Sequence, residues 1–126
     1  MILVDTSVWI DHLRNGNFGL TSLLDQHCVV MHPTVLGELA CGNLPNRQEL
    51  LHLWQHLESM PTVSHDEALF FIERIGLMGK GIGYVDVHLL ASIALAGGTK
   101  LWTLDQRLAQ VATELKFAWT EPVQDA

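Results

Sequence analysis

The chain has 126 residues, of which 48% are hydrophobic, so it can build the core of one compact domain over residues 1–126 and is not a disordered polypeptide. Its 14 Asp and Glu against 7 Lys and Arg give a net charge of −7, which excludes a protein that binds nucleic acid through overall positive charge. The longest apolar run, residues 89–96, is too short to span a bilayer, and no targeting segment follows Met1. We therefore expect a cytoplasmic protein without a membrane partner.

Short apolar runs rich in β-prone residues predict the strands. They are MILV at 1–4, CVVM at 28–31 and KLW at 100–102, with a weaker candidate at 117–119 and a short edge piece at 61–63. Helical stretches separate these runs, which predicts parallel strands joined by helical crossovers. We expect an α/β protein, specifically a three-layer α/β/α sandwich around a central, mainly parallel sheet of four to five strands.

Apolar periodicity and residues that favour helix starts predict the helices. They cover 6–14, a segment that begins at Pro33 and carries Glu38, 46–58, and the segments that follow SHDE at 64–67, GKGIG at 79–83 and TLDQ at 103–106. SHDE and TLDQ fit capping boxes, in which a hydroxyl side chain begins the helix, and GKGIG fits a flexible break between two helices.

The cysteines and one histidine pair match no metal or redox motif. Cys28 and Cys41 are interpreted as reduced thiols of the core, with a disulfide as the less favoured alternative. His52 and His56 are spaced i, i+4 and could chelate Zn²⁺, but Leu53 stands where the metalloprotease motif has Glu. We therefore expect surface histidines.

Four acids stand at special places: Asp5 after the first strand, Glu38 and Asp86 in the early turns of two helices, and Asp105 after the strand at 100–102. In a parallel sheet, strand ends and the helix starts beside them share one edge, where such folds build their sites. Each acid alone is more often a helix cap than a ligand. Four together repel one another unless some take up protons or a cation lies among them, and a set of carboxylate oxygens favours Mg²⁺ or Mn²⁺. Such an ion could recruit a phosphate group and polarise a phosphodiester.

With these residues in view, the chain resembles the PIN-domain family, and more narrowly the VapC-type toxins of prokaryotic toxin–antitoxin pairs. The resemblance is carried by VDTSVW at the first strand, ELACG around Glu38, DVHLLASIALA from Asp86 and TLDQRL around Asp105. It implies an endoribonuclease in which Asp5, Glu38, Asp86 and Asp105 bind Mg²⁺ or Mn²⁺. It also implies a homodimer and a protein antitoxin. One departure is Leu108, where the family commonly has an aromatic residue.

Residues around the acids have more than one interpretation. Thr6, Ser7 and Thr103 would support the acids or face the phosphate, whereas Ser7 and Thr103 equally fit helix caps. The remaining candidates are Lys80, Arg14 and Arg107 as RNA contacts or solvated surface cations, and Trp9 and Trp54 as antitoxin or dimer contacts or plain core aromatics.

Three alternatives stay open from the residues alone. A phosphatase with an aspartyl nucleophile also has Asp after its first strand, but it needs a second Asp two residues on, where this chain has Ser7. A module that has lost catalysis and only binds RNA or a protein would not need the full set of acids. A PIN-type nuclease without an antitoxin is the third alternative.

Overall fold

A computed structural model describes residues 1–122 and contains a parallel four-stranded sheet. The strands are β1 (Ile2–Val4), β2 (Val29–Met31), β3 (Glu58–Ser59) and β4 (Lys100–Trp102), in the order β3-β2-β1-β4. Leu3 pairs with Val30 on one side and with Leu101 on the other. The residues of β1 and β2 are all buried, as expected for parallel strands covered on both faces.

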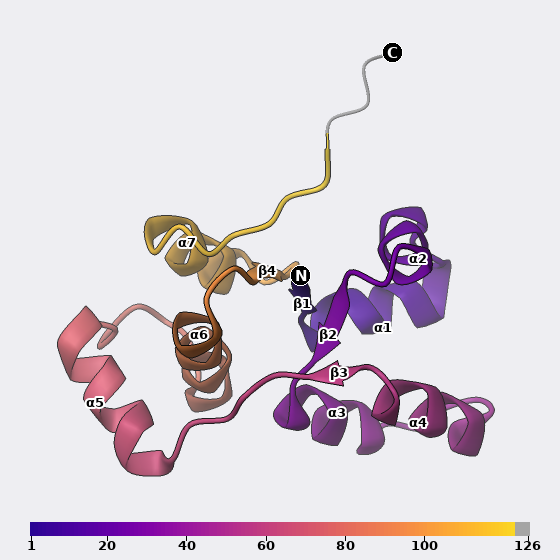
Figure 1. Ribbon diagram of the computed structural model, residues 1–126, viewed down its shortest axis with the longest axis horizontal. Helices are drawn as coiled ribbons and strands as arrows, with labels where there is room; N and C mark the ends of the chain where they lie inside the picture. The colour runs from indigo at the N-terminus through magenta and orange to yellow at the C-terminus, as the bar shows by residue number, and fades with distance from the viewer. Residues whose placement is uncertain (123–126) are drawn as a thin grey trace.

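Seven helices cover this sheet in two layers (Figure 1). They are α1 (Thr6–Asn15), α2 (Phe18–Asp25), α3 (Pro33–Ala40), α4 (Arg47–Gln55), α5 (His65–Ile75), α6 (Tyr84–Ala96) and α7 (Gln106–Glu114). The chain crosses from β1 to β2 to β3 in one direction and then returns beyond β1 to β4. Because such crossovers are right-handed, α1–α4 lie on one face and α5–α7 on the other, which confirms the predicted three-layer fold.

Helix starts follow local chemistry at several points. Ser64 and Glu67 form the predicted capping box of α5, with Glu67 N bonded to Ser64 Oγ at 3.1 Å and Ser64 N to Glu67 Oε1 at 2.9 Å. Pro33 occupies the first turn of α3, where a missing N–H costs nothing. The TLDQ capping box is wrong: the residue before α7 is Asp105, whose side chain accepts from Arg107 N and Leu108 N.

Three predictions about elements are corrected. Helix α2 was not predicted, because its 8 residues are too few to show more than one repeat of the helical period. The edge strand is β3 at Glu58–Ser59 and not 61–63, which is irregular. The segment 117–119 contributes one parallel bridge, Leu101 to Ala118, and no strand.

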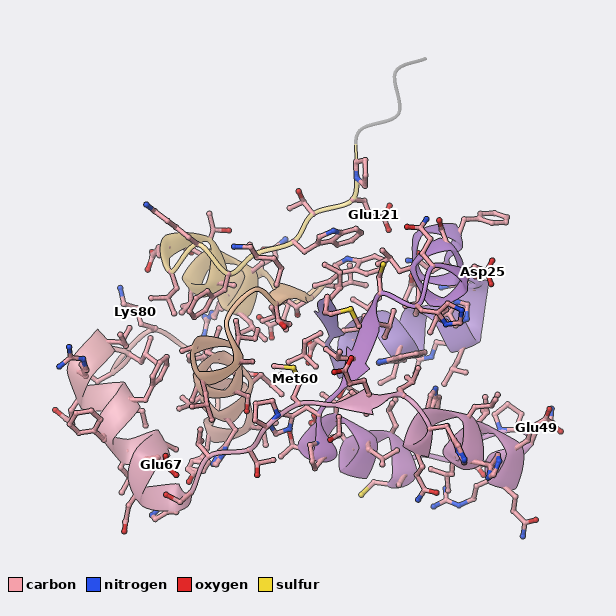
Figure 2. All side chains as sticks on the ribbon, viewed as in Figure 1. Asp25, Glu49, Met60, Glu67, Lys80 and Glu121 are labelled. Atoms are coloured by element: carbon pink, nitrogen blue, oxygen red, sulfur yellow. The ribbon has the colours of Figure 1, made fainter. Side chains whose placement is uncertain are left out.

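The side chains of the core form one cluster that spans both helical layers and the sheet. Met60, only 6% exposed, lies in the interior between α6 and the strands (Figure 2). Both cysteines are free, as predicted, but they are not core thiols: Cys41 is exposed and Cys28 half-buried. None of the helices described has the length and apolar character needed to cross a membrane.

Candidate active site

The carboxyl-terminal edge of the sheet collects the residues that sequence reasoning singled out. Asp5 follows β1 directly, and Thr103 follows β4, the strand paired with β1. The two strand ends are joined because Asp5 N donates to Trp102 O at 2.9 Å. The edge therefore brings together side chains almost one hundred residues apart in sequence.

Asp5 is held by hydroxyl groups from two elements and does not cap its own helix. It is 8% exposed, and its Oδ2 accepts hydrogen bonds from Thr103 Oγ1 at 2.7 Å and from Ser7 Oγ at 2.9 Å. It precedes α1, yet its side chain bonds none of the free N–H groups there. The capping interpretation of Asp5 is therefore wrong, and its carboxylate has been oriented by other means.

Ser7 and Thr103 likewise support the site instead of capping helices. Ser7 Oγ accepts from Leu104 N at 3.0 Å, and Thr103 Oγ1 accepts from Asp105 N at 3.0 Å. The two hydroxyl oxygens lie 3.3 Å apart. Together they connect the start of α1 to the segment between β4 and α7.

The other three acids are also anchored through hydrogen bonds. Glu38 Oε1, on α3, accepts from Thr6 Oγ1 at 2.9 Å. Asp86 Oδ2, on α6, accepts from Gly83 N at 3.1 Å. Asp105 Oδ1 accepts from two backbone N–H groups of α7, so here the cap interpretation is confirmed without excluding a second role.

One oxygen of each acid is engaged and the other is not. Among residues 1–122, Asp5 Oδ1, Glu38 Oε2, Asp86 Oδ1 and Asp105 Oδ2 accept no hydrogen bond. Within the same residues, the single ion pair between side chains joins Lys80 and Glu114, so none of the four has a basic partner. Other acids are dispersed over the periphery, as the labelled Asp25, Glu49, Glu67 and Glu121 show (Figure 2). The four form a cluster of uncompensated negative charge.

The pKa of Asp86 reports this charge. Burial raises the pKa above its ordinary value of 3.8, and the hydrogen bond from Gly83 N opposes this rise. The charges of Asp5, Asp105 and Glu38 raise the pKa further. Asp86 therefore lies within the electrostatic field of the other three acids, although the four come from separate segments of the chain.

A hard divalent cation fits this donor set, because carboxylate oxygens without basic partners are the environment that such ions neutralise. Within the described chain, no three carboxylate, imidazole or thiol groups converge tightly enough to ligate one ion directly. Mg²⁺ usually takes one or two carboxylates and keeps several waters. The spacing of the four acids therefore suits an ion that one or two of them would bind directly and the others would bind through water.

The basic candidates lie at different distances from the acids. Lys80 Nζ lies 3.6 Å from Glu114 Oε2 on α7, and Lys80 is exposed at the edge of the molecule (Figure 2). Arg107 lies over Gly81 in the loop before α6. Arg14 is eight residues beyond Thr6, about 12 Å along the axis of α1, so the structure does not bring it to the acids.

Trp9 and Trp54 are buried core aromatics, 2% and 4% exposed, and they also border a cavity. Their rings meet edge-to-face with centroids 5.7 Å apart. The cavity has a volume of about 320 Å³ and an almost wholly apolar lining: Trp9, His12, Leu13, Leu24, Leu50, Leu53, Trp54 and Leu57. We call it the tryptophan cavity; three of its lining residues, Leu50, Leu53 and Trp54, lie on α4.

Sequence reasoning missed His32, which joins two helices that carry acids. It follows β2, is 1% exposed, and its Nδ1 accepts from Thr34 N at 3.1 Å at the start of α3. Its Nε2 lies 3.0 Å from Ser92 Oγ on α6. Burial, together with the charge of His88, lowers its pKa from 6.5 to about 4. The position of His32 directly after an apolar strand was the available signal.

Comparison with known families agrees with this geometry. The sequence profile of the PIN domain matches residues 2–114, and the chain belongs to the PIN domain family. Two relatives named Ribonuclease VapC32 come from Mycobacterium tuberculosis strains CDC 1551 / Oshkosh and ATCC 25618 / H37Rv. Each is 46% identical to this chain over 123 residues, which are 98% of this chain and 99% of the relative.

Proposed function

We propose that this chain is an endoribonuclease that depends on Mg²⁺ or Mn²⁺, hydrolyses RNA phosphodiester bonds in the cytoplasm, and is the toxin of a toxin–antitoxin pair. One observation carries the proposal: acids from four separate elements share one sheet edge, and none has a basic partner among residues 1–122. The name of the two VapC32 relatives supports a ribonuclease.

Asp5, Glu38, Asp86 and Asp105 would hold the ion through their unengaged oxygens. When bound, the ion would polarise a phosphodiester and lower the pKa of an attached water. Asp5 is the best-oriented ligand, because two hydroxyl groups hold its Oδ2 and leave Oδ1 free. Thr6, Ser7 and Thr103 act by positioning these acids, through Glu38 and Asp5.

Lys80 and Arg107 would contact RNA phosphates beside the acids. The ion pair of Lys80 with Glu114 is exposed on both sides, 44% and 48%, and exposed pairs contribute little to stability. Lys80 can therefore exchange Glu114 for a phosphate at little cost. Arg14 would contact only RNA that extends along α1.

The proposal is tested with purified protein, single-stranded and structured RNA, and Mg²⁺, Mn²⁺ or EDTA. We expect cleavage with either ion, none in EDTA, and loss of cleavage in Asp5→Asn. The matched control Asp25→Asn, at an exposed position on α2, should cleave as the wild type does. Mn²⁺ should also raise the Tm of the wild type, because a ligand of the native state stabilises it.

Three other outcomes would contradict the proposal, each in a different way. Cleavage in EDTA, or by Asp5→Asn, rules out the mechanism. RNA binding without cleavage and without a Tm rise in Mn²⁺ indicates a silent binding module. Hydrolysis of a simple phosphate monoester would favour the phosphatase instead.

Two apolar surfaces suit the partners implied by a toxin. The tryptophan cavity would receive apolar side chains of an antitoxin helix, since Leu53 at its rim is 56% exposed. A homodimer would cover Phe70 on α5 and Leu95 on α6, which are 65% and 58% exposed. Leu53→Glu should weaken antitoxin binding and leave the dimer intact, and Phe70→Glu should do the reverse. Identical behaviour of the two variants in sedimentation and antitoxin pull-down would contradict this assignment.

A further inference from the structure

Three aromatic rings gather where α5 and α6 begin. Tyr84 is the first residue of α6, and His65 is the first residue of α5. Their ring centroids lie 5.6 Å apart with an interplanar angle of 28°. The ring centroid of His88, one turn further along α6, lies 4.7 Å from that of Tyr84, and the two rings are tilted by 52°.

The rings leave aromatic surface open to solvent. Tyr84 is 41% exposed, and His65 is also exposed. Rings in stacking contact lie ~3.5 Å apart, so a centroid distance of 5.6 Å places His65 to the side of Tyr84 by ~4 Å. A hydrogen bond between Tyr84 Oη and His65 Nδ1 agrees with this offset, because it places His65 beside the hydroxyl end of the ring. Tyr84 is 41% exposed with both histidines in place, so part of its side chain remains accessible to a ligand.

The rings adjoin the acids. Tyr84 precedes Asp86 by two residues, about 3 Å along the axis of α6, so the two side chains leave different faces of the same first turn. His88 lies close enough to His32 for their charges to interact, and His32 follows β2 just as Asp5 follows the neighbouring β1. The ring cluster, defined as His65, Tyr84 and His88, thus borders the acids on the β2 side of the sheet edge.

The negative charge of this protein opposes the binding of RNA, which is also negatively charged. The chain carries a net charge of −7, and the acids have no basic partners among the residues described. Base stacking on aromatic rings needs no positive charge and tolerates any base, because every base has a π-face. A base can stack on a protein ring only if it is unpaired and splayed out of a helix.

We propose that the ring cluster, with Tyr84 as its main surface, stacks one unpaired RNA base beside the phosphate that the acids receive. This inference rests on the proposed ribonuclease function and adds to it the side chains that would hold a base next to the phosphate. Tyr84 supplies the stacking face, and His65 shares a hydrogen bond with its hydroxyl group at the edge of that face. Bases within a duplex are already stacked and would gain nothing from this surface.

The test measures binding of short single-stranded RNAs that carry 2-aminopurine, whose fluorescence falls on stacking, in EDTA so that no cleavage occurs. Tyr84→Phe keeps the ring and should bind and quench as the wild type does. Tyr84→Leu keeps an apolar side chain without a π-face and should weaken binding about 5- to 150-fold, with loss of quenching. Phe18→Leu, at a residue 95% exposed on α2, is the matched control and should have no effect.

Two further binding measurements, at several salt concentrations and with duplex RNA, distinguish stacking from charge-based binding. The dependence of affinity on salt should be equal in Tyr84→Leu and the wild type, because stacking releases no counterions, whereas Lys80→Ala should reduce it. A duplex of the same sequence should bind Tyr84→Leu and Tyr84→Phe equally. Equal binding of single-stranded RNA by these two variants overturns the inference, as does a changed oligomeric state of Tyr84→Leu in sedimentation. If the wild type neither binds nor cleaves RNA, the proposed function itself fails.

Discussion

Single side chains in this protein show how a carboxylate can be oriented without being neutralised. Asp5 Oδ2 accepts two hydroxyl hydrogen bonds, and Glu38, Asp86 and Asp105 each engage one oxygen in a similar way. Hydroxyl and backbone N–H donors carry no charge. They therefore determine where each acid points while leaving its negative charge for a cation.

Asp86→Asn tests the electrostatic cost of this arrangement. In EDTA near neutral pH the variant should have a higher Tm than the wild type, because it removes a charge that burial and three acids disfavour. The asparagine oxygen can still accept from Gly83 N.

The sign of the pH dependence follows from the raised pKa of Asp86. Stability from this group is present while it is protonated and is lost as pH rises through its raised pKa. The gain in stability of Asp86→Asn over the wild type should therefore shrink as pH falls toward 3.8, the ordinary pKa of this group.

In Mn²⁺ the Asp86→Asn variant should show no rise in Tm. Thermal unfolding at several pH values measures both effects, with Asp25→Asn as control; a variant less stable than the wild type in EDTA would contradict the prediction.

At the level of elements, the loop between α5 and α6 is tied to α7. Gly79 and Gly81 both adopt left-handed backbone, with φ of 73° and 79°. A Cβ on Gly81 would lie 2.8 Å from Cδ and Nη1 of Arg107, whereas a Cβ on Gly79 would meet nothing within 4 Å. Arg107 and the ion pair from Lys80 to Glu114 thus attach this loop, which leads into Asp86, to the helix capped by Asp105.

Because only Gly81 lies against Arg107, alanine substitutions at Gly79 and Gly81 form a matched pair. Gly79→Ala and Gly81→Ala should each lose roughly 1–2 kcal/mol of unfolding free energy from the left-handed backbone. Gly81→Ala should lose more, because it must also displace Arg107, and it alone should reduce RNA cleavage. In an Arg107→Ala background the two substitutions should cost the same in urea denaturation. Equal costs in the wild-type background would show that the Arg107 contact contributes nothing.

Across the whole molecule, His32 connects the sheet to both helical layers. It follows β2, caps α3 through Thr34 N, and contacts Ser92 on α6, which lies on the opposite face. Because its Nδ1 accepts from a backbone N–H, the neutral ring carries its proton on Nε2 and donates it to Ser92. Protonation of Nδ1 would break the bond to α3, so the fold requires the neutral form.

The stability of the protein should consequently fall in mild acid. The pKa of His32 is about 4 in the folded chain and 6.5 in the unfolded chain. As the pH falls below 6.5, the unfolded chain therefore takes up a proton at His32 before the folded chain does, which favours unfolding. The loss approaches about 3 kcal/mol near pH 4. His32→Asn keeps an N-cap acceptor but does not titrate, so its stability should depend less on pH between 6.5 and 4 in urea unfolding. The control His52→Asn, at an exposed position, should track the wild type; equal slopes for His32→Asn and the wild type would refute this role.

The sequence by itself determined the fold class, three of the strands and the capping box of α5, and it predicted the four acids and the hydroxyl residues beside them. These features depend on local patterns: an apolar run predicts a buried strand, and an acid directly after such a run lies at the sheet edge. It also correctly placed His52 and His56 on the surface. It failed for α2 and β3, where the pattern is short, and for the position of Cys41, which lies beyond the last turn of α3.

Only the tertiary structure decided which groups meet. Thr103 reaches Asp5 across 98 positions, Thr6 reaches Glu38 across 32, and His32 reaches Ser92 across 60. Such contacts depend on how the crossovers place one strand end or helix beside another, and no local pattern encodes a distance between them. For the same reason the sequence predicted four acids at one edge, whereas the fold determined which oxygen of each is engaged and which is left for a cation.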